Sequence, residues 1–304
     1  MKRFLLSCLL VTVAGTVALT SQSDGRRPTV VVDAVALDKN GAPVTDLKPS
    51  DVEVWIGRFQ VPIDTLELVT HDREGAGRII ILLMDDMTVQ LSMIARAQEA
   101  ARRFVTSMLP GDRAAVVMLS DPSFETTSDM AKLRRAVESY TVRATGVMRQ
   151  EDVGAHVLKT VAGIAGALLE AGEGRKAIVG IGSGWVYDRP IPPPQVSTLN
   201  PLPDWIDAMR AMSRSRTAFY VIDPGGLGNI RADGGDSGFA RETGGHAYLN
   251  VNDLELAADR IRRETSSYYM ITTGNPPVGG SGLRQLDVKS LRTGVTIRTR
   301  RAVH

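Results

Sequence analysis

Cysteine is almost absent from the sequence. Cys8 is the single cysteine among 304 residues, and it lies in the apolar segment at the start of the chain. If that segment is removed during export, the mature protein has no thiol. A disulfide bond, a metal centre with cysteine ligands and a cysteine nucleophile are then all excluded.

Histidine and aromatic residues are also scarce. The sequence has four histidines, and Phe, Trp and Tyr together make up 5% of it. Charge is nearly balanced, with a formal net charge of +2, so the composition does not indicate a nucleic-acid partner. The hydrophobic share of 43% is that of an ordinary globular protein, which excludes disorder of the whole chain.

The N-terminal segment carries an apolar run. "MKRFLLSCLLVTVAGTVALTSQS" begins with cations, continues through apolar residues 4–19 and ends in small and polar residues. This pattern is typical of a secretory signal peptide, which we place at residues 1–23. The run is shorter than the roughly 20 residues of a membrane span. We therefore expect a secreted or periplasmic protein with no transmembrane domain in its mature part; an uncleaved anchor is the alternative.

Short β-type runs occupy both ends of the mature chain. Residues 24–72 contain "TVVVDAVALD", "DVEVWIG" and "VPIDTLELV", and the pair Asn40-Gly41 between the first two is a signal for a hairpin. Residues 267–304 contain "SYYMITTG", "LRQLDVKSL" and "GVTIRTRRAV". We expect these terminal strands to pair into one small β-module.

The last of these strands is basic. Alternation places Arg298 and Arg300 on one face of it. We interpret the strand as an edge strand on which exposed charge prevents edge-to-edge aggregation. An anionic surface partner is the alternative.

Residues 73–266 alternate between strand and helix patterns. "RIIILLMD" is a continuous apolar run, as in a buried parallel strand, and apolar residues at helical spacing follow over residues 92–108. The alternation continues through "RAAVVMLS", "KAIVGIGSG", "TAFYVIDP" and "HAYLNV". We predict an α/β domain with a doubly wound, mostly parallel, Rossmann-like sheet of about six strands, covered by helices on both faces and flanked by the β-module.

Oxygen-bearing side chains follow the predicted strands of this sheet. Ligands of open parallel sheets bind at the carboxyl ends of the strands, because loops and helix N-termini meet there. We therefore expect the binding site at this edge. The side chains are those of Asp85, Asp86, Thr88, Ser120, Asp121, Ser183 and Asp223.

Several blocks of the sequence stand in the order found in one family. They are "VDAVALDKNGAPVTDLKPSDVEV", "PGDRAAVVML", "GRKAIVGIGSG" and "ETGGHAYLNVNDLELAADRIRRETSSYYMI". Through these blocks most of the mature chain, residues 73–266 above all, resembles the von Willebrand factor type A (VWA) domain, in the variant found in exported bacterial proteins of the acidobacterial type.

The resemblance implies a metal-ion-dependent adhesion site (MIDAS). In the family, Asp-x-Ser-x-Ser after the first strand, a later threonine and a distant aspartate surround Mg²⁺ with oxygen atoms, which suits this ion. Read from Asp86, "DDMTVQ" places Thr88 and Gln90 at the two hydroxyl positions. Ser183 stands in place of the distant aspartate, and Thr145 matches the later threonine. The resemblance thus implies a degenerate site with these five residues as the remaining ligands.

The two aspartates have a second interpretation. Read from Asp85, the hydroxyl positions hold Met87 and Val89, so the ligand pattern disappears. An aspartate at a strand end also accepts hydrogen bonds from the amide groups of the next loop. In this interpretation Asp85 and Asp86 shape a turn and no Mg²⁺ is bound.

A proline-rich segment follows "GIGSGW". Residues 188–205, "DRPIPPPQVSTLNPLPDW", are long for a connection between strand and helix, and their prolines favour an extended conformation. Trp185, Tyr187 and Trp205 flank the segment, and aromatic side chains on a stiff loop are good interface anchors. The alternative is that the rings hold the loop against the core.

A catalytic role for Ser183 is a weaker interpretation. The G-x-S-x-G nucleophile elbow needs a glycine at the position of Ile181. None of the histidines lies in a predicted loop that must face Ser183 and serve as its base. We predict a non-enzymatic VWA-like module that binds an unidentified protein partner. The alternatives are an envelope structural component that binds through its β-module, and a small-ligand or enzymatic domain that uses the same sheet edge. The predicted partner-binding residues are Asp85, Asp86, Thr88, Ser183, Trp185, Tyr187 and Trp205.

Overall fold

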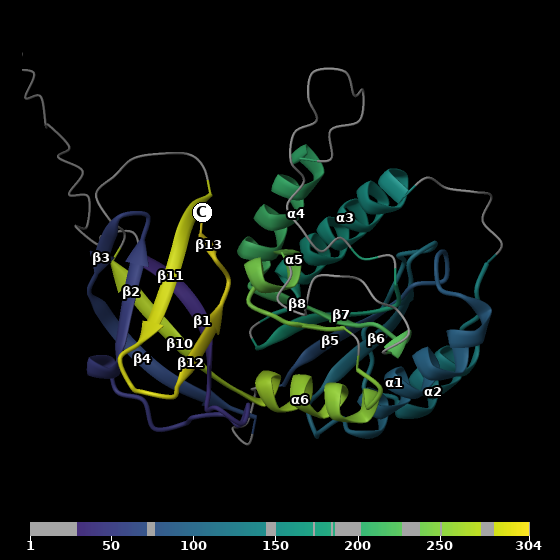
Figure 1. The fold of residues 1–304 in the computed structure, drawn as a ribbon, viewed down its shortest axis with the longest axis horizontal. Helices are drawn as coiled ribbons and strands as arrows, with labels where there is room; N and C mark the ends of the chain where they lie inside the picture. Colours follow the sequence, from purple (N-terminus) through teal and green to yellow (C-terminus); the bar gives the residue numbers. More distant parts are fainter. Residues whose placement is uncertain are drawn as a thin grey trace, which may run out of the picture.

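The computed structural model of the protein consists of a central α/β domain and a β-module beside it (Figure 1). The strands of the β-module come from the two ends of the described chain, and the central domain lies between them in sequence. The described residues are 29–71, 77–143, 150–172, 174–183, 185, 202–226, 238–249, 251–274 and 283–303.

The central sheet is built from the continuous apolar runs of the sequence. Its strands lie in the order β6-β5-β7-β8-β9, and every neighbouring pair is parallel. Three of them, β5, β7 and β8, are buried along their whole length, as expected for strands covered on both faces. The strands are β5 (Ile79–Met84), β6 (Arg113–Met118), β7 (Lys176–Ile181), β8 (Thr217–Ile222) and β9 (Ala247–Tyr248).

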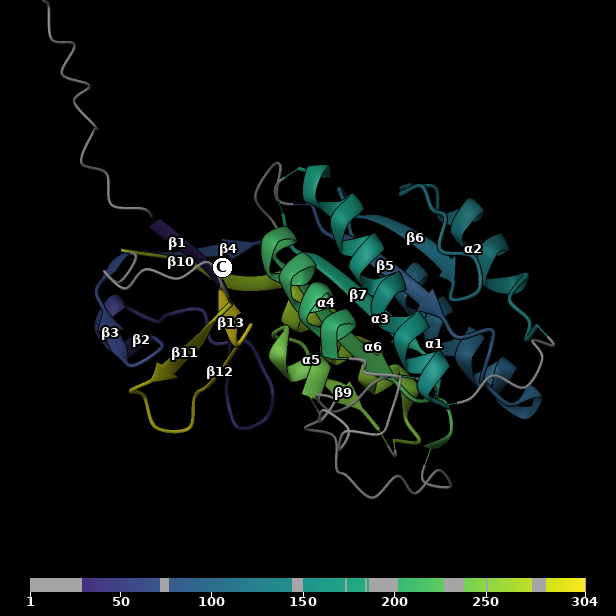
Figure 2. The ribbon, with the colours of Figure 1, turned by 90° about the horizontal axis from the view of Figure 1, so that it is seen from above.

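Helices cover both faces of this sheet, as predicted. Apolar side chains of α3, α4 and α5 share a core with one face, and those of α1, α2 and α6 share a core with the other (Figures 1 and 2). The helices are α1 (Ile94–Thr106), α2 (Met130–Glu138), α3 (Gln150–Ala167), α4 (Leu202–Ser215), α5 (Gly238–Glu242) and α6 (Leu254–Ser266), with short 3₁₀ turns η1 (Pro49–Asp51), η2 (Leu91–Met93) and η3 (Leu168–Glu170).

One helical stretch, Asp152–Glu170, is long and apolar enough to cross a membrane. In the structure its apolar side chains pack on the central sheet, among them Val157, Val161 and Ile164. The stretch therefore has the position of a core helix of an α/β domain.

The described residues form five strands of the central sheet, where the sequence predicts about six. After β6 the chain makes isolated antiparallel contacts, such as the bridge between Thr127 and Ala114, and the described residues 119–143, 150–172 and 174–175 form no further strand before β7. The segment after β6, "DPSFETTSD", is mostly polar and contains a proline, a composition that does not favour a further strand.

The terminal strands form two packed antiparallel sheets, in the orders β12-β1-β10-β4 and β13-β11-β2-β3. Val32, Val54, Ile271 and Leu286 come from different strands and lie in one buried core between them. The predicted β-module is therefore confirmed as a small two-sheet sandwich. Its strands are β1 (Thr29–Leu37), β2 (Val52–Ile56), β3 (Phe59–Val61), β4 (Ile63–Thr70), β10 (Ser267–Gly274), β11 (Arg284–Ser290), β12 (Thr296–Thr299) and β13 (Ala302–Val303).

Asn40-Gly41 makes a turn but not the predicted hairpin. Gly41 has a φ of 75°, and the Asp38 carboxylate accepts hydrogen bonds from the N–H groups of Asn40 and Ala42. The returning chain meets β1 only at the bridge between Leu37 and Pro43. β1 then pairs with β10 and β12 instead of β2, so the turn passes the chain from one sheet to the other.

The predicted solvent-facing role of Arg298 and Arg300 is also wrong. Arg298 donates to Glu264 Oε1 at 2.7 Å, and Arg300 donates to the backbone carbonyl of Val31. β12 is indeed an edge strand, but Glu264 belongs to α6 of the central domain. The arginines therefore face the junction of the two units and not an open sheet edge.

Arg78 connects the start of β5 to the end of α6. It is one of the largest fully buried side chains, and its guanidinium forms a two-pronged ion pair with the Asp112 carboxylate, with Nε at 2.9 Å from Oδ1. Its Nη1 donates to the Arg262 carbonyl at 3.1 Å and to the hydroxyls of Thr265 and Ser266 at 3.2 and 3.0 Å. Arg78 thus fixes the end of α6, where the chain returns to the β-module.

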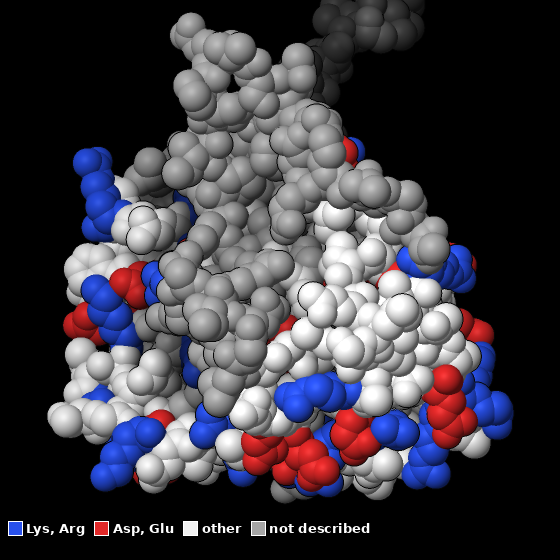
Figure 3. Space-filling view, turned by 45° about the vertical axis from the view of Figure 1, so that its right-hand side comes forward, with Lys and Arg blue, Asp and Glu red and all other residues white. Residues whose placement is uncertain are grey.

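Acidic and basic residues alternate on the outer surface of α1 and α6. Arg103 of α1 pairs with Asp259 of α6 at 3.0 Å and lies 3.9 Å from Glu255. The face in Figure 3 shows both signs mixed along its lower edge, with uncharged surface above them. Charges mixed in this way do not form the basic stripe that a nucleic acid would require.

Candidate functional site

The Asp85 carboxylate joins two loops at the carboxyl end of the central sheet. Asp85 directly follows β5, and its N–H continues the sheet by donating to the Ile181 carbonyl at 3.0 Å. Its Oδ1 accepts from the N–H groups of Met87 and Thr88 at 3.1 and 2.8 Å, and its Oδ2 accepts from the Thr88 hydroxyl and from the Ser183 N–H at 3.2 Å. The side chain is fully buried, so these protein donors replace water around it.

Asp86 makes a separate set of contacts. Its carboxylate accepts from the N–H of Ser120 at 2.9 Å and from the Ser120 hydroxyl, at the end of β6. The Arg143 Nε lies 3.6 Å from Asp86 Oδ2, and the Arg143 N–H donates to the Asp86 carbonyl at 2.8 Å. The two adjacent aspartates therefore serve different neighbours: Asp85 holds the loop after β7, and Asp86 holds the loop after β6.

Ser183 links the Asp85 loop to the end of β8. Its hydroxyl donates to Asp223 Oδ1 at 3.4 Å, and Asp223 Oδ1 also accepts from the Gly225 N–H at 2.8 Å. The close approach requires glycine at position 182, because a Cβ there would lie 2.1 Å from the Asp85 Cβ. Gly182 of "GIGSG" thus serves close packing against Asp85.

Tyr140 supports the same site from the segment after α2. Its hydroxyl donates to the Asp85 backbone carbonyl at 2.7 Å. Burial raises the pKa of Tyr140, and the negative charges of Asp85 and Asp86 raise it further, so the hydroxyl stays protonated as a donor. Sequence reasoning did not identify Tyr140 or Arg143, because both lie far from the strand ends in sequence and carry no motif.

The proposed ligands of the MIDAS are not brought together in the described residues. Thr88 and Ser183 contact Asp85, whereas Asp86 faces Ser120 and the cationic Arg143. Gln90 is exposed at the start of η2, and Thr145 lies outside the described residues. Within the described chain, no group of three or more His, Cys, Asp or Glu side chains could hold a metal ion. The donor set does not fit an octahedral Mg²⁺ site, because Asp86 faces Ser120 and Arg143 while Thr88 and Ser183 face Asp85.

The tryptophans predicted as interface anchors belong to the core. Trp185 and Trp205 are 2% and 4% exposed. Trp185 packs edge-on against Phe219, and Trp205 packs edge-on against Phe239. The expectation of exposed anchors is therefore wrong for these two residues, and the alternative, in which the rings hold the chain to the core, describes them.

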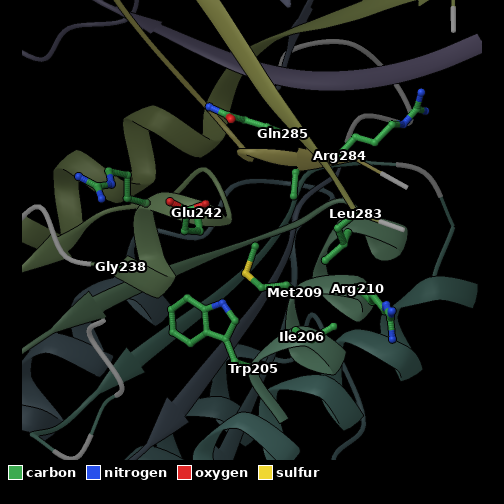
Figure 4. A pocket seen from close by; sticks show the side chains of 11 residues that line it. Trp205, Ile206, Met209, Arg210, Gly238, Glu242, Leu283, Arg284 and Gln285 are labelled. Atoms are coloured by element: carbon green, nitrogen blue, oxygen red, sulfur yellow. The ribbon is translucent and has the colours of Figure 1, made fainter. Parts of the chain in front are cut away.

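Trp205 also forms one wall of a pocket between the central domain and the β-module (Figure 4). The pocket has a volume of about 650 Å³ and is also lined by Met209, Glu242 and Leu283. It lies on the α4 and α5 side of the central sheet. Tyr187 and most of the proline-rich segment, residues 186–201, lie outside the described residues.

The histidines of the described residues do not form a catalytic pair with Ser183. His156 Nε2 lies 2.8 Å from the Leu119 carbonyl, to which it donates a hydrogen bond, and not beside Ser183. His71 lies beside Asp112, which precedes β6 and so belongs to the opposite edge of the sheet. His246 packs against the ring of Tyr248.

Exposed side chains lie in the segments that follow β5, β6 and α2. Leu91, at the start of η2, is 73% exposed, the highest value among the large hydrophobic residues described. Gln90 and Asp121 are also exposed, and the Arg143 side chain is 60% exposed. These four residues, which we call the edge rim, combine an apolar contact with one charge of each sign.

The sequence and the structure were compared with those of known proteins. No family model and no curated protein matches the sequence. Among solved structures, the chain is similar to an aerotolerance-related membrane protein from Bacteroides fragilis, with a TM-score of 0.39 and 15% identity over 62% of this chain and 98% of that one. It is also similar to the SpRpn10 VWA domain, with a TM-score of 0.31 and 17% identity over 48% of this chain and 74% of that one.

A third similar structure is the pilus adhesin SpaC from Lactobacillus rhamnosus GG, with a TM-score of 0.38 and 8% identity over 86% of this chain and 43% of that one. All three likenesses concern the fold alone. The central domain has a doubly wound parallel sheet with helices on both faces.

Proposed function

We propose that this protein is an exported, non-enzymatic interaction module that binds a protein partner at the carboxyl-terminal edge of its parallel sheet without a divalent metal ion. The observation that supports this proposal is that the Asp85 carboxylate is already hydrogen-bonded to the neighbouring loops. Four donors from Met87, Thr88 and Ser183 occupy its carboxylate, so the oxygen atoms hold loops in place. A fixed set of loops is a suitable platform for a partner.

The edge rim is the proposed contact surface. Exposed Leu91 offers an apolar contact, and Asp121 and Arg143 offer charges that a partner can match. Arg143 also places a positive charge beside Asp86, where a MIDAS would carry its metal ion. In this proposal the Arg143 guanidinium beside Asp86 supplies the positive charge that a partner carboxylate would meet.

The two alternative functions have weaker support. An enzyme at this edge would need a base for Ser183, and the carboxylate nearest to its hydroxyl, Asp223, also accepts from a backbone N–H. A structural role through the β-module would use the exposed Leu291, which follows β11. Export is proposed from the signal-peptide pattern of residues 1–23, which lie outside the described residues.

Titration with Mg²⁺, Mn²⁺ and Ca²⁺ is expected to give no saturable heat in calorimetry of the mature chain, residues 24–304. The reason is that binding would have to displace the protein hydrogen bonds of Asp85 and the Arg143 pair of Asp86. Asp86→Asn should behave in the same way as the unaltered protein. Saturable binding that is lost in Asp86→Asn would contradict the metal-free proposal and would support a working MIDAS.

Leu91→Asp is expected to reduce capture of the protein's partner from envelope extract by at least about tenfold, since a charge would have to be buried in the contact. The matched control is Leu291→Asp, an exposed leucine of the β-module. Captured proteins would be identified by mass spectrometry and their binding measured with purified components. If Leu91→Asp keeps every partner while Leu291→Asp loses them, the β-module is the binding surface and the edge proposal is wrong.

A further inference from the structure

Two arginines, Arg175 and Arg216, lie beside the buried Asp33 at the junction of the two units, and a third, Arg300, donates to the carbonyl of Val31 in the same strand. Asp33 lies in β1 of the β-module, and Arg300 follows β12. Arg175 and Arg216 immediately precede β7 and β8 of the central sheet. The cluster is therefore at the amino-terminal ends of these strands, opposite the edge that carries Asp85.

The charged groups in this cluster approach one another without closing into hydrogen bonds. Arg175 Nη1 lies 3.6 Å from Asp33 Oδ2, and Arg216 Nη1 lies 3.6 Å from Asp33 Oδ1. Asp33 Oδ1 is buried without a hydrogen-bond partner. The Nε atoms of Arg175 and Arg300 are buried and have none either. Arg175 is only 4% exposed, so its unpaired Nε is not hydrogen-bonded by bulk water.

Positive charge exceeds negative charge in the cluster by two, since Asp33 is the one carboxylate paired with it among the described residues. The neighbouring pair of Arg298 with Glu264 is balanced and does not compensate it. The pKa of Arg300 is lowered to about 10, chiefly because the side chain is buried. The positive charges of Arg216 and Arg175 also lower this pKa, whereas the negative charge of Asp33 raises it. Arg300 nevertheless stays charged at neutral pH. Uncompensated buried charge is costly unless another group pairs with it.

The backbone at Arg216 is a second, independent observation. Arg216 is the one residue other than glycine with a positive φ in the described chain, at 54°. It follows the last residue of α4, a position that glycine or asparagine usually occupies because a Cβ there costs roughly 1 kcal/mol or more. An arginine is nevertheless present, and its guanidinium reaches Asp33. The strain is explained if this position must supply a cation to the cluster.

We propose that the cluster of Arg175, Arg216 and Arg300 binds a small inorganic anion at the junction of the two units. Guanidinium groups present planar sets of N–H donors that match halide ions and oxyanions. Two of the arginines come from the central domain and the third from the β-module, so a bound anion stabilises the contact between the units. Arg216 is 27% exposed, which gives the anion access from solvent. The site is separate from the proposed partner-binding edge.

Thermal unfolding of the mature chain at constant ionic strength tests this proposal, with chloride, sulfate or phosphate replacing a bulky organic anion. The midpoint is expected to rise with one or more of these ions, on the order of 3 °C for each tenfold increase above the dissociation constant. Arg216→Asn should abolish the rise and still fold, because asparagine tolerates the backbone conformation. Arg292→Asn, which removes an arginine from an exposed pair with Asp46, should keep it.

Three outcomes would overturn the proposal. The first is an unchanged midpoint at every anion concentration. The second is an equal rise for all anions that follows ionic strength, which is general screening. The third is a rise that survives in both Arg216→Asn and Arg175→Gln. Calorimetric titration of the same variants with the stabilising ion provides a direct readout that does not depend on unfolding.

Discussion

Replacing Arg78 with methionine is expected to lower the free energy of unfolding by about 3–5 kcal/mol, the usual cost of removing one partner from a buried ion pair. Methionine fills much of the space of the arginine side chain but offers no donor. The substitution leaves the buried carboxylate of Asp112 without its cation, and the Arg262 carbonyl and Thr265 hydroxyl lose a donor. Urea unfolding followed by circular dichroism measures the difference.

The pH dependence of stability gives this prediction a second measurement. Burial by itself raises the pKa of Asp112, but the hydrogen bonds from Arg78 and from the Leu109 N–H, with the charge of Arg78, hold that pKa below its ordinary value. An aspartate with a lowered pKa stabilises the folded state above the pKa of the unfolded chain, and this contribution is lost as pH falls toward the lower folded value. The stabilities of Arg78→Met and the unaltered protein should therefore converge below about pH 4.

The matched control is Arg102→Met, which removes an exposed arginine from a pair with Glu99 on α1. Its free energy of unfolding should change by no more than about 0.5 kcal/mol. Equal effects of the two substitutions would show that Arg78 does not hold the end of α6 as described.

Asp85→Ala is expected to lower the free energy of unfolding by about 3 kcal/mol, because it leaves several buried donors without an acceptor. The Thr88 and Ser183 N–H groups lose their partner together, so the loops after β5 and β7 lose their connection. Amide hydrogen exchange should accelerate at Ser183, while the N–H groups inside β7 keep their protection.

Asp121→Ala provides the comparison, because Asp121 is an exposed aspartate after the neighbouring strand β6. It should leave stability nearly unchanged and should not alter exchange at Ser183. If Asp85→Ala is as stable as Asp121→Ala, the Asp85 carboxylate does not organise the site, and the platform required by the proposed function would lose its basis.

The central fold could be predicted from the sequence because its signals are local. A continuous apolar run such as Ile79–Met84 needs cover on both faces, and the helical spacing that follows supplies that cover. The position of the site at the strand ends followed from the same reasoning. The different roles of Asp85 and Asp86 did not, because they depend on β5 lying between β6 and β7, an order that the sequence does not state.

The burial of Trp185 had a signal that the sequence analysis did not use. Gly180 lies inside the buried strand β7, and a Cβ there would come within 2.9 Å of the Trp185 ring. A glycine in a strand interior often marks the close approach of another group. The cluster of Asp33 with Arg175, Arg216 and Arg300 had no comparable signal in the sequence. These four residues are brought together only when the β-module packs on the central domain.

The central domain is inserted in sequence between the strands of the β-module, which has a consequence for synthesis of the chain. In its sheet, β1 lies between β10 and β12, and both of these strands follow the central domain in sequence. At about 5–20 residues per second, the ribosome needs roughly 10–40 s to make the approximately 200 residues between β4 and β10. During translation β1 therefore has neither β10 nor β12 to pair with until the central domain has been synthesised, and the central domain can fold first. The unit that is begun first is completed last.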